Sequence, residues 1–530
     1  MDRKQYLEAG KGILGLELGS TRIKAVLIDD RHQPIAMGSY DWENRLENGI
    51  WTYDLGEAEK GVGRCYHELK KDVLNQYGVR LKKVAAIGIS GMMHGYLPFD
   101  DAGRQLVPFR TWRNTMTEEA VEKLNPLFDF NIPQRWSIAH LYQAILKKEE
   151  HVGKIDFLTT LAGYIHWKLT GKKVLGVGEA SGMFPIDSKT NTYEEKKIGK
   201  FHSLPEVEAL DLDLHTLLPK VLVAGEEAGR LTQEGALLLD EEGELEAGIP
   251  LCPPEGDAGT GMVATNSVAV GTGNVSAGTS VFAMVVLKEK LKKRHEELDL
   301  VTTPSGEAVA MVHCNNCTTD LNAWVSLFED FAACLSVKTD KNHLYETLYG
   351  KALEGDADCG GLLACNYYSG EHIVGVNEGR PLLVRTPQAN FTLANLMRAH
   401  LYSALVTLKL GMNILIREEG VEVSRIYGHG GLFKTRGVAQ RFLAAATNAP
   451  VAVRETAGEG GPWGMALLAA YMKKKKPQES LQDYLETKVF GEEEGLILEA
   501  SEEEKQGFEA YAKAYEKALT VEKEAIRSFP

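Results

Sequence analysis

Two stretches near the middle of the chain combine residue types that phosphoryl transfer requires. Asp257 is a lone carboxylate among glycines and small residues, and Gly278, Thr279 and Ser280 follow it in a turn between two apolar runs. A carboxylate can orient and deprotonate a hydroxyl, and the backbone N–H groups of such a turn can hold phosphate oxygens. An aspartate at the start of a helix is also a common N-cap, but the nearby turn favours a general base at Asp257.

A matching turn occurs near the N-terminus. Gly19, Ser20 and Thr21 lie between apolar runs, with a spacing like that of the later turn. Glycine allows close backbone approach, and the hydroxyl groups can reach phosphate oxygens. One such hairpin is weak evidence, because glycine is common in hairpin turns. Two of them, one near the start of each half, predict a duplicated domain with paired phosphate loops facing one cleft.

Other polar groups suit a substrate that is rich in hydroxyl groups. His94 follows the buried run at residues 84–90, and ligands gather at the carboxyl ends of strands in α/β folds. A second group combines an aromatic face, a cation and an amide, as sugar sites do: Trp112, Arg113 and Asn114. A structural histidine and a core tryptophan are the alternatives at these two places.

A glycine cluster late in the chain offers a surface for a flat ligand. Residues 423–427 read as a strand, and Gly430 and Gly431 follow it, with Lys434 beyond them. Backbone without side chains between a strand and a helix lets a ring lie close to the chain. Adenine or ribose is the natural candidate for this position.

The candidate site residues lie at the ends of predicted strands and helices, which alternate along the chain. The patterns predict hairpins at residues 13–28 and 271–287, further strands at residues 34–39, 84–90, 96–99, 248–252 and 423–427, and helices at residues 57–78, 258–264, 321–335, 391–419 and 458–471. Residues 117–172 read as mainly helical, with breaks at Pro126 and Pro133. An α/β fold follows from this alternation.

Length, composition and charge exclude several classes of protein. The chain has 530 residues, 44% of them hydrophobic and 25% charged, which predicts two large folded domains. The net charge of −15 argues against a nucleic-acid partner, since a duplex-binding surface is normally basic. Residues 1–12 are polar and the apolar runs read as strand-length, so we expect neither a leader nor a membrane span. We expect a cytoplasmic enzyme.

The cysteines fit the same compartment. There are seven of them, an odd number, as expected for free thiols in a reducing environment. Cys314 and Cys317 form a CxxC pair, with Cys359 and Cys365 further along. Zinc is conceivable here, but the second pair is spaced too widely for the usual pattern. We expect buried thiols.

The order of the motifs resembles that of the FGGY carbohydrate kinases, and of xylulokinase-like members most closely, over residues 12–475. The resemblance implies two ribonuclease-H-like domains of the actin and hexokinase superfamily, with sugar and ATP meeting in a central cleft. It places the sugar-binding side and the first phosphate loop in residues 12–266. The ATP-binding side falls in residues 267–475, and residues 476–530 form an acidic helical tail.

The resemblance also implies roles for individual residues. Asp257 is the catalytic base, and Glu17 and Asp257 help to hold Mg²⁺. The substrate side comprises Met93, His94, Trp112, Arg113, Asn114 and Asp257. The ATP side comprises both phosphate loops and the glycine cluster: Gly19, Ser20, Thr21, Lys24, Gly278, Thr279, Ser280, Gly430, Gly431 and Lys434. Residues 459–464 resemble the turn that starts a late helix.

Two residues depart from the family's pattern. The first loop normally carries Asp where this chain has Glu17, which is one methylene longer and so shifts or weakens the metal contact. The family usually has Asp at the position of Asn114, so a hydroxyl partner remains but a charge is lost. We therefore expect the acceptor to be a ketose that resembles xylulose or ribulose, or a related polyol.

Two further functions stay open. A sensor that binds sugar and nucleotide with weakened catalysis would account for Glu17 and Asn114. An ATPase of the same superfamily, acting on another partner, would not require His94 or Trp112. The motifs favour an ATP-dependent carbohydrate kinase, with a sugar, ATP and Mg²⁺ as its small-molecule partners and a homodimer as the family's assembly.

Overall fold

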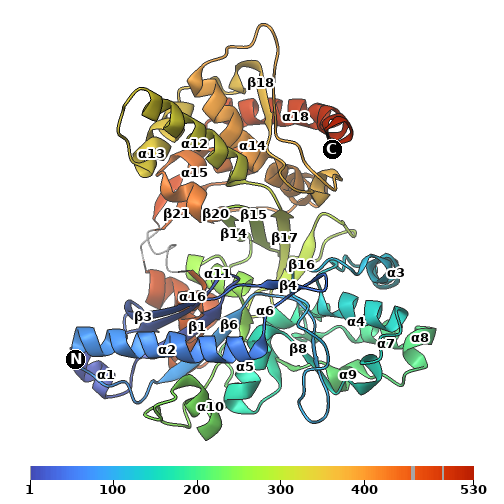
Figure 1. Cartoon of the computed structure of the whole chain (residues 1–530), viewed down its shortest axis with the longest axis vertical. Coiled ribbons are helices and arrows are strands. Elements are labelled where there is room, and N and C mark those ends of the chain that lie inside the picture. The colour runs from blue at the N-terminus through green and yellow to red at the C-terminus, as the bar shows by residue number, and fades with distance from the viewer. Residues whose placement is uncertain (1, 455–459, 492–494, 530) are drawn as a thin grey trace. The chain divides into compact units, whose positions relative to one another are not determined.

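The computed structural model describes residues 2–454, 460–491 and 495–529. The chain divides into two compact units (Figure 1). The first unit comprises residues 1–268, 300–309 and 459–492, and the second comprises residues 269–299, 310–458 and 493–530. Each unit is built around a sheet of its own.

The sheet of the first unit begins with the predicted hairpin. Its strands are β1 (Ile13–Leu18), β2 (Arg22–Ile28), β3 (Pro34–Asp41), β6 (Ala86–Gly91) and β13 (Glu255–Gly256), in the order β13-β6-β1-β2-β3. β1, β2 and β3 pair antiparallel, whereas β1, β6 and β13 run parallel. Apolar residues on both sides bury β1 and β6 almost completely, as expected for central strands covered by helices.

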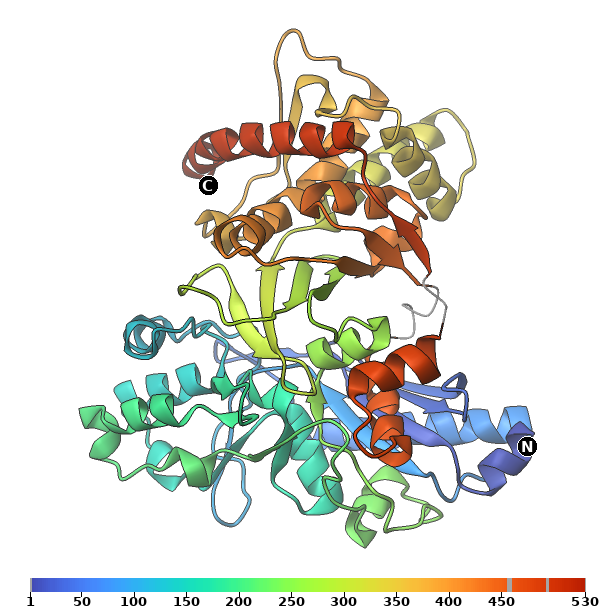
Figure 2. The same ribbon diagram turned by 180° about the vertical axis from the view of Figure 1, so that it is seen from behind.

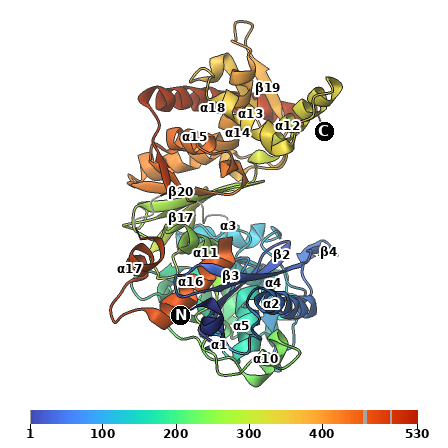
Figure 3. The same cartoon turned by 90° about the vertical axis from the view of Figure 1, so that its left-hand side faces the viewer.

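Helices cover both faces of this sheet. α2 (Leu55–Tyr77) packs against β2 and β3, while α16 (Gly460–Lys474) packs against β1, β6 and α11 (Asp257–Thr265). Figures 1 and 2 show α2 and α16 on opposite faces of the sheet, and Figure 3 shows α16 beside α11. The predicted helix at residues 57–78 is thereby confirmed, and it ends at Gly78 with a φ of 66°, the usual left-handed cap.

Smaller elements complete the first unit. They are α1 (Arg3–Glu8), β4 (Arg45–Glu47), β5 (Ile50–Thr52), β7 (Leu97–Phe99), α3 (Glu118–Phe128), α4 (Ser137–Leu146), β8 (Phe157–Thr159), α5 (Leu161–Thr170), β9 (Val174–Gly176), α6 (Val177–Ala180), β10 (Ile186–Asp187), β11 (Thr192–Tyr193), α7 (Glu195–His202), α8 (Pro205–Glu208), α9 (Leu214–Leu217), β12 (Lys220–Leu222), α10 (Gln233–Leu239) and α17 (Leu481–Tyr484).

Two local predictions in this unit were wrong. Pro126 does not break the helical region but lies in the last turn of α3, where its missing N–H removes one backbone hydrogen bond at most. The predicted strand at residues 248–252 is reduced to isolated bridges at Pro250 and Leu251, and the paired strand is β13. Pro250 within the stretch, and Pro253 and Pro254 directly after it, lack the N–H that a ladder needs.

The second unit repeats the strand pattern of the first. β14 (Thr272–Ala277) and β15 (Val281–Val286) form an antiparallel hairpin, and β20 (Arg425–His429) and β21 (Val451–Val453) extend it in parallel. The remaining strands of the sheet are β16 (Asp299–Thr302), β17 (Ala308–Cys314) and β22 (Leu496–Leu498). The predicted duplication is therefore visible: each unit has an antiparallel hairpin that is extended by two parallel strands.

The helices of the second unit surround one apolar helix. α14 (Leu393–Asn413) contacts α13 (Lys341–Ala352), α15 (Val438–Thr447) and α18 (Glu502–Ser528). The other elements here are α12 (Thr318–Cys334), β18 (Leu362–Cys365) and β19 (Leu382–Arg385). With the π-helical turn that follows it, the run Leu393–Glu418 is long and apolar enough to cross a membrane, but 78% of its most apolar window is buried inside the protein. The expectation that apolar runs are only strand-length was wrong at this place.

The compact units do not coincide with the stretches predicted as domains. Residues 459–492 cluster with the first unit because α16 packs on β1 and β6, although the predicted second domain reaches residue 475. Most of the predicted tail at residues 476–530 is helical, through α17 and α18. The predicted limits at residues 266 and 475 remain predictions.

Candidate active site

Three parallel strands of the first unit end at the same edge of the sheet. The register places Glu17 of β1 and Glu255 of β13 on either side of Ser90 in β6. The residues that follow these strands therefore emerge together, and they include the Met93–His94 turn and Asp257. Parallel strands place their carboxyl ends at one edge, and here that edge gathers an acidic group.

Asp257 is the first residue of α11, so its side chain is not the N-cap of that helix; Gly256 occupies the cap position. The Met93 N–H lies 3.4 Å from Asp257 Oδ1. The side chain is accessible to solvent by its surface area, but the crowding of protein atoms around it raises its pKa to about 6, against the opposing pull of the Met93 and Ala258 amides. A carboxylate with this pKa is ionised at neutral pH and still basic enough to accept a proton.

Glu17 lies close to Asp257. Burial raises its pKa to about 7; the Lys24 ammonium lowers it and the Asp257 carboxylate raises it. Lys24 stands opposite Glu17 in the β1–β2 hairpin. A Cβ atom on Gly461 would overlap Glu17 Oε1, so the longer side chain fits because α16 begins with glycine. Residue 459 of the predicted turn at 459–464 lies outside the described residues.

The Met93–His94 turn has an unusual backbone. His94 has a φ of 69° and Gly95 one of 97°, and the left-handed region is uncommon for a residue with a side chain. The Gly95 N–H donates to Arg135 O at 3.2 Å. The His94 Nδ1 lies 3.2 Å from Gly182 O, and its ring stacks on Trp136 with 6.1 Å between centroids. A strained residue held from several sides is typical of a functional position.

The Trp112–Asn114 group is held mainly by contacts with Trp51 of β5. The Asn114 amide exchanges hydrogen bonds with the Trp51 backbone, donating to its carbonyl at 2.8 Å and accepting from its N–H at 2.9 Å. The Arg113 guanidinium lies over the Trp51 ring, 4.1 Å from its centroid. Trp112 is 36% exposed. Sugar binding by these three residues stays a prediction, and the structure gives Asn114 a structural role as well.

Aromatic side chains hold the first hairpin turn. The Trp42 Nε1 donates to Gly19 O at 2.7 Å, and the Tyr53 hydroxyl donates to Ser20 O at 2.7 Å. Thr21 remains exposed. The turn is thus anchored through its carbonyl groups, which is compatible with the predicted use of its N–H and hydroxyl groups.

In the second unit, the hairpin turn and the glycine cluster lie side by side. β14 and β20 are parallel, with Ser276 opposite His429, so Gly278 and Gly430 both follow the same sheet edge. Gly430 has a φ of 99°, and a Cβ atom there would lie 2.5 Å from Ala277 O. Only glycine fits such a position. The sequence predicted both motifs, and the structure brings them together.

The groups around these two turns are polar and partly exposed. Gly278 O accepts from Thr318 N at 3.1 Å and Thr318 Oγ1 at 2.8 Å, while Thr279 is exposed. Gly431 and Lys434 are the exposed ends of a 3₁₀ turn whose middle residues, Leu432 and Phe433, are buried. Burial lowers the pKa of His429 to about 4, so its imidazole is neutral, and its Nε2 lies 3.5 Å from Asn274 Nδ2.

Two buried carboxyl groups beside Asp257 were not predicted as site residues. Glu255 accepts hydrogen bonds from the N–H groups of Gly178 and Glu179, at 3.3 and 2.9 Å, and burial raises its pKa to about 8. Glu179 is fully buried. The sequence held no signal for Glu179, because a single acid in a mixed stretch looks like a surface residue until its burial is known.

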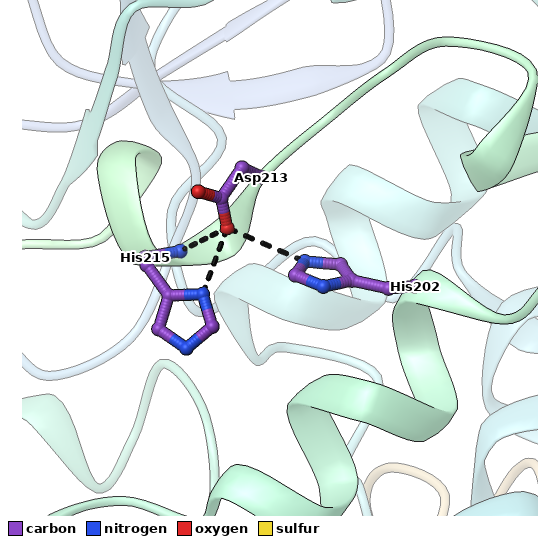
Figure 4. Close-up of side chains that lie close together, drawn as sticks. All are labelled: His202, Asp213 and His215. Atoms are coloured by element: carbon purple, nitrogen blue, oxygen red, sulfur yellow. Dashed lines mark hydrogen bonds and ion pairs between the residues drawn. The ribbon is translucent and has the colours of Figure 1, made fainter.

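A separate cluster of His202, Asp213 and His215 has atoms close enough to share a metal ion (Figure 4). These side chains already form hydrogen bonds with one another or with their neighbours. His215 lies between Asp213 at 2.8 Å and Glu195 at 3.0 Å, and the His202 Nε2 accepts from Leu214 N at 3.0 Å. Hydrogen bonds to Glu195 and Asp213 raise the pKa of His215. These contacts account for the cluster without a metal.

The cysteines agree with the prediction of free thiols. Cys314, Cys317, Cys359 and Cys365 are all unpaired and buried. Within the described part of the chain, the His202 cluster is the only group of metal-ligating residues that lies close enough together. Burial raises the pKa of Cys317 and Cys365, so these thiols stay protonated and unreactive.

Comparison with known proteins agrees with this architecture. The sequence matches the N-terminal domain of the FGGY family of carbohydrate kinases over residues 12–263 and the C-terminal domain of that family over residues 273–472. It is 23% identical to the xylulose kinase of Haemophilus influenzae over 438 residues, which covers 79% of this chain and 82% of that protein. A glycerol kinase of Thermococcus kodakarensis is 21% identical over 288 residues, 52% of this chain and 53% of its own.

Solved structures share the fold. A ligand-bound xylulose kinase from Lactobacillus acidophilus superposes with a TM-score of 0.79 at 17% identity, covering 96% of this chain and 98% of its own. A glycerol kinase from Plasmodium falciparum with ADP gives a TM-score of 0.74 at 16% identity, with the same two coverages. The predicted two-domain fold of the actin and hexokinase type is confirmed. Both halves of the chain match, and the chain belongs to the FGGY family of carbohydrate kinases, enzymes that phosphorylate an alcohol group.

Proposed function

We propose that the protein transfers the γ-phosphoryl group of MgATP to a hydroxyl group of a ketose or a related polyol, with Asp257 as the general base. The observation that supports this most strongly is the shared edge of β1, β6 and β13. It brings together Glu17, the Met93–His94 turn and Asp257. An acid pair and a strained histidine turn at one sheet edge suit an acceptor hydroxyl and a phosphate.

Asp257 would take the proton of the acceptor hydroxyl. As the hydroxyl oxygen bonds to the γ-phosphorus, the bond from that phosphorus to the bridging oxygen of ADP breaks. The pKa of about 6 leaves Asp257 ionised at neutral pH, and the Met93 N–H at 3.4 Å orients its carboxylate. Positioned general bases of this kind contribute about 100- to 10,000-fold to a rate.

The two carboxylates fit a divalent cation. Glu17 and Asp257 offer the oxygen donors that Mg²⁺ prefers, and the Asp257 charge raises the pKa of Glu17, as expected of two acids that a cation would relieve. Bound Mg²⁺ would supply positive charge against the phosphate oxygens. The Glu17 side chain extends from β1 to the start of α16, where the absence of a Cβ atom on Gly461 leaves room for its carboxylate.

Nucleotide binding is assigned mainly to the second unit. Gly278, Thr279 and Ser280 would hold phosphate oxygens, and Gly430 and Gly431 would face the adenosine. This assignment draws support from the close approach of Gly430 to Ala277, which makes one continuous surface of the two turns. Lys434, exposed at the end of the 3₁₀ turn, and the Gly19–Thr21 turn with Lys24 would add further phosphate contacts.

The identity of the acceptor is the finer part of the proposal. The similar proteins carry the names xylulose, glycerol and gluconate kinase, so the family does not point to one acceptor. Because the Asn114 amide already bonds to the Trp51 backbone, we assign the main acceptor contacts to Met93, His94 and Asp257. A cytoplasmic location belongs to the same proposal and rests on the unpaired cysteines.

The test is ADP release from MgATP in a coupled assay against a panel of ketopentoses, ketohexoses and polyols. We expect strong turnover that depends on one acceptor and is lost in Asp257→Asn. Turnover that no acceptor changes would favour the ATPase instead. Thermal stabilisation by acceptor and ATP without turnover would favour a sensor that binds sugar and nucleotide. The departures from the family's pattern at Glu17 and Asn114 are the reason for considering this alternative.

A further inference from the structure

The short segment at residues 177–182, here called the bridging segment, contacts His94 of the proposed acceptor site and Glu255, two residues before Asp257. It comprises α6 and the two residues that follow it. It is buried along its whole length. Thr302 anchors it from the side, donating from Oγ1 to Val177 O and from its N–H to Ser181 Oγ, both at 3.1 Å. Such burial and bonding make it a rigid support.

At one end, the bridging segment is joined to the residues before Asp257. Glu255 accepts from the N–H groups of Gly178 and Glu179. The Glu179 side chain in turn lies against Gly256. A Cβ atom placed on Gly256 would lie 2.5 Å from Glu179 Oε2 and would overlap Met93 Cγ. The Glu179 side chain therefore packs against the backbone that carries Asp257.

At the other end, the bridging segment supports His94. Gly182 O lies 3.2 Å from His94 Nδ1. A Cβ atom on Gly182 would lie 2.6 Å from the same nitrogen and 3.1 Å from Met93 Cε. The imidazole is thus held between Gly182 on one side and the Trp136 ring on the other.

Glu179 is an unusual residue for such a support. It is 0% exposed, and neither carboxyl oxygen has a partner at standard hydrogen-bond geometry among the described residues, although the Thr160 hydroxyl is near enough to lower its pKa. The groups that face it are the Asp257 and Glu255 carboxyls, the Thr160 hydroxyl and the Tyr193 phenol. Burial, more than these acids, raises the pKa of Glu179 well above its usual range, so its shape rather than a charge serves the fold.

We propose that the bridging segment sets the position of Asp257 relative to His94, with Glu179 as the positioning residue for Asp257 and Gly182 as that for His94. The proposal rests on the function proposed above. It predicts that damage to the two ends has different kinetic effects. Misplacing a general base lowers kcat, whereas misplacing a group that binds the acceptor raises its KM.

The test compares Glu179→Ala, Glu179→Gln and Gly182→Ala. Glu179→Ala leaves space beneath Gly256, and we expect kcat to fall at least about tenfold with the KM for ATP unchanged. Glu179→Gln keeps the shape without the acid, and we expect kcat within about threefold of wild type. Gly182→Ala pushes on the imidazole, and we expect the acceptor KM to rise at least about tenfold. Gly199→Ala, a glycine of α7 with open space around it, is the matched control and should change neither constant.

A second measurement separates this proposal from the proposed function. The imidazole NMR signals of His94, identified by their loss in His94→Gln, should shift in Gly182→Ala and stay in place in Gly199→Ala. If wild type phosphorylates no acceptor, the proposed function fails, but this shift still tests the bridging segment. Unmoved His94 signals in Gly182→Ala, or a kcat loss in Glu179→Gln as large as in Glu179→Ala, would overturn the proposal. If Glu179→Ala does not fold, Glu179→Gln and Gly182→Ala still decide it.

Discussion

The two units share one strand pattern but carry different residues at the strand ends. In each, a hairpin is extended by two parallel strands whose carboxyl ends share an edge. The edge in the first unit carries Glu17, Glu255 and Asp257, whereas the edge in the second carries Gly278 and Gly430. Acids with raised pKa values suit proton transfer and metal binding. Exposed glycines suit backbone contact with phosphate and a flat ring. The frame is shared, so the residues at the strand ends decide what each unit does.

Asp257→Asn should have the largest effect on turnover. If the first unit supplies the base, kcat falls about 100- to 10,000-fold, the range for a positioned general base, while the dissociation constant for ATP stays near that of wild type. Single-turnover kinetics and calorimetric nucleotide titration measure the two effects. Thr279→Ala is the counterpart in the second unit and should weaken nucleotide binding with little change in kcat. Near-normal turnover in Asp257→Asn would end the assignment.

A substitution in the second unit should act on stability and nucleotide affinity together. Gly430→Ala places a Cβ atom 2.5 Å from Ala277 O at a φ of 99°, which costs about 2 kcal/mol or more. Gly350→Ala is the matched control, since Gly350 lies in α13 with nothing within 4 Å of the added atom, and it should lower neither stability nor nucleotide affinity. Thermal unfolding and ADP titration check both. Equal effects of the two changes would mean that the turns do not depend on this close approach.

The pH dependence should belong to the first unit alone. Asp257 must be ionised to accept a proton, so kcat/KM should fall about tenfold per pH unit below its pKa of about 6. The affinity of the second unit for nucleotide should not fall in this pH range. A fall of the same size in ADP affinity below pH 6 would contradict the assignment of the base to the first unit alone.

The same raised pKa has a consequence for stability. Asp257 binds its proton more tightly when folded, so its contribution is present below the ordinary pKa of 3.8 and is lost as the pH rises through about 6. Asp257→Asn should therefore unfold at a higher temperature than wild type at pH 8, with the gap closing at acidic pH. A gap that widens toward acidic pH would reverse the assigned direction of the shift.

The smallest expected effect concerns the His202–Asp213–His215 cluster of the first unit. Hydrogen bonds to Glu195 and Asp213 raise the pKa of His215, so its stabilisation is present below 6.5 and is lost as the pH rises through the raised value. His215→Gln should lower stability at pH 6 by less than about 1 kcal/mol, since the pair is exposed, and by less still at pH 9. Thermal unfolding at both values, with and without added Zn²⁺, also tests whether a metal matters here.

Much of the fold could be predicted from local patterns. The hairpin at residues 13–28, the helix ending at Gly78 and the helix at Asp257–Thr265 agree with the apolar periodicity and the glycine signals. Two local rules failed, at Pro126 and at residues 248–252. In the first case the last helical turn tolerates proline, and in the second prolines prevent the pairing that the apolar run suggested.

The proposed site was predictable only in part. Glycines, hydroxyls and a lone aspartate at turn positions carry a local signal, so Gly19, Asp257, Gly278 and Gly430 could be chosen from the sequence. Glu179 could not, because an acid in a mixed stretch looks like a solvated surface residue until its burial is known. Asn114 illustrates the reverse: its residue type suits a sugar hydroxyl, but its amide bonds to the Trp51 backbone.

The residue types at the strand ends, the repetition of the hairpin and the family to which these motifs point can be read from the chain alone, because each depends on short-range pattern. Folding is needed to bring those residues to one sheet edge, to pack α16 on β1 with room for Glu17 at Gly461, and to join Asp257 to His94 through residues 177–182. These contacts link residues far apart in the chain. Burial, pKa and backbone clash depend on that packing and not on the identity of the neighbours in sequence.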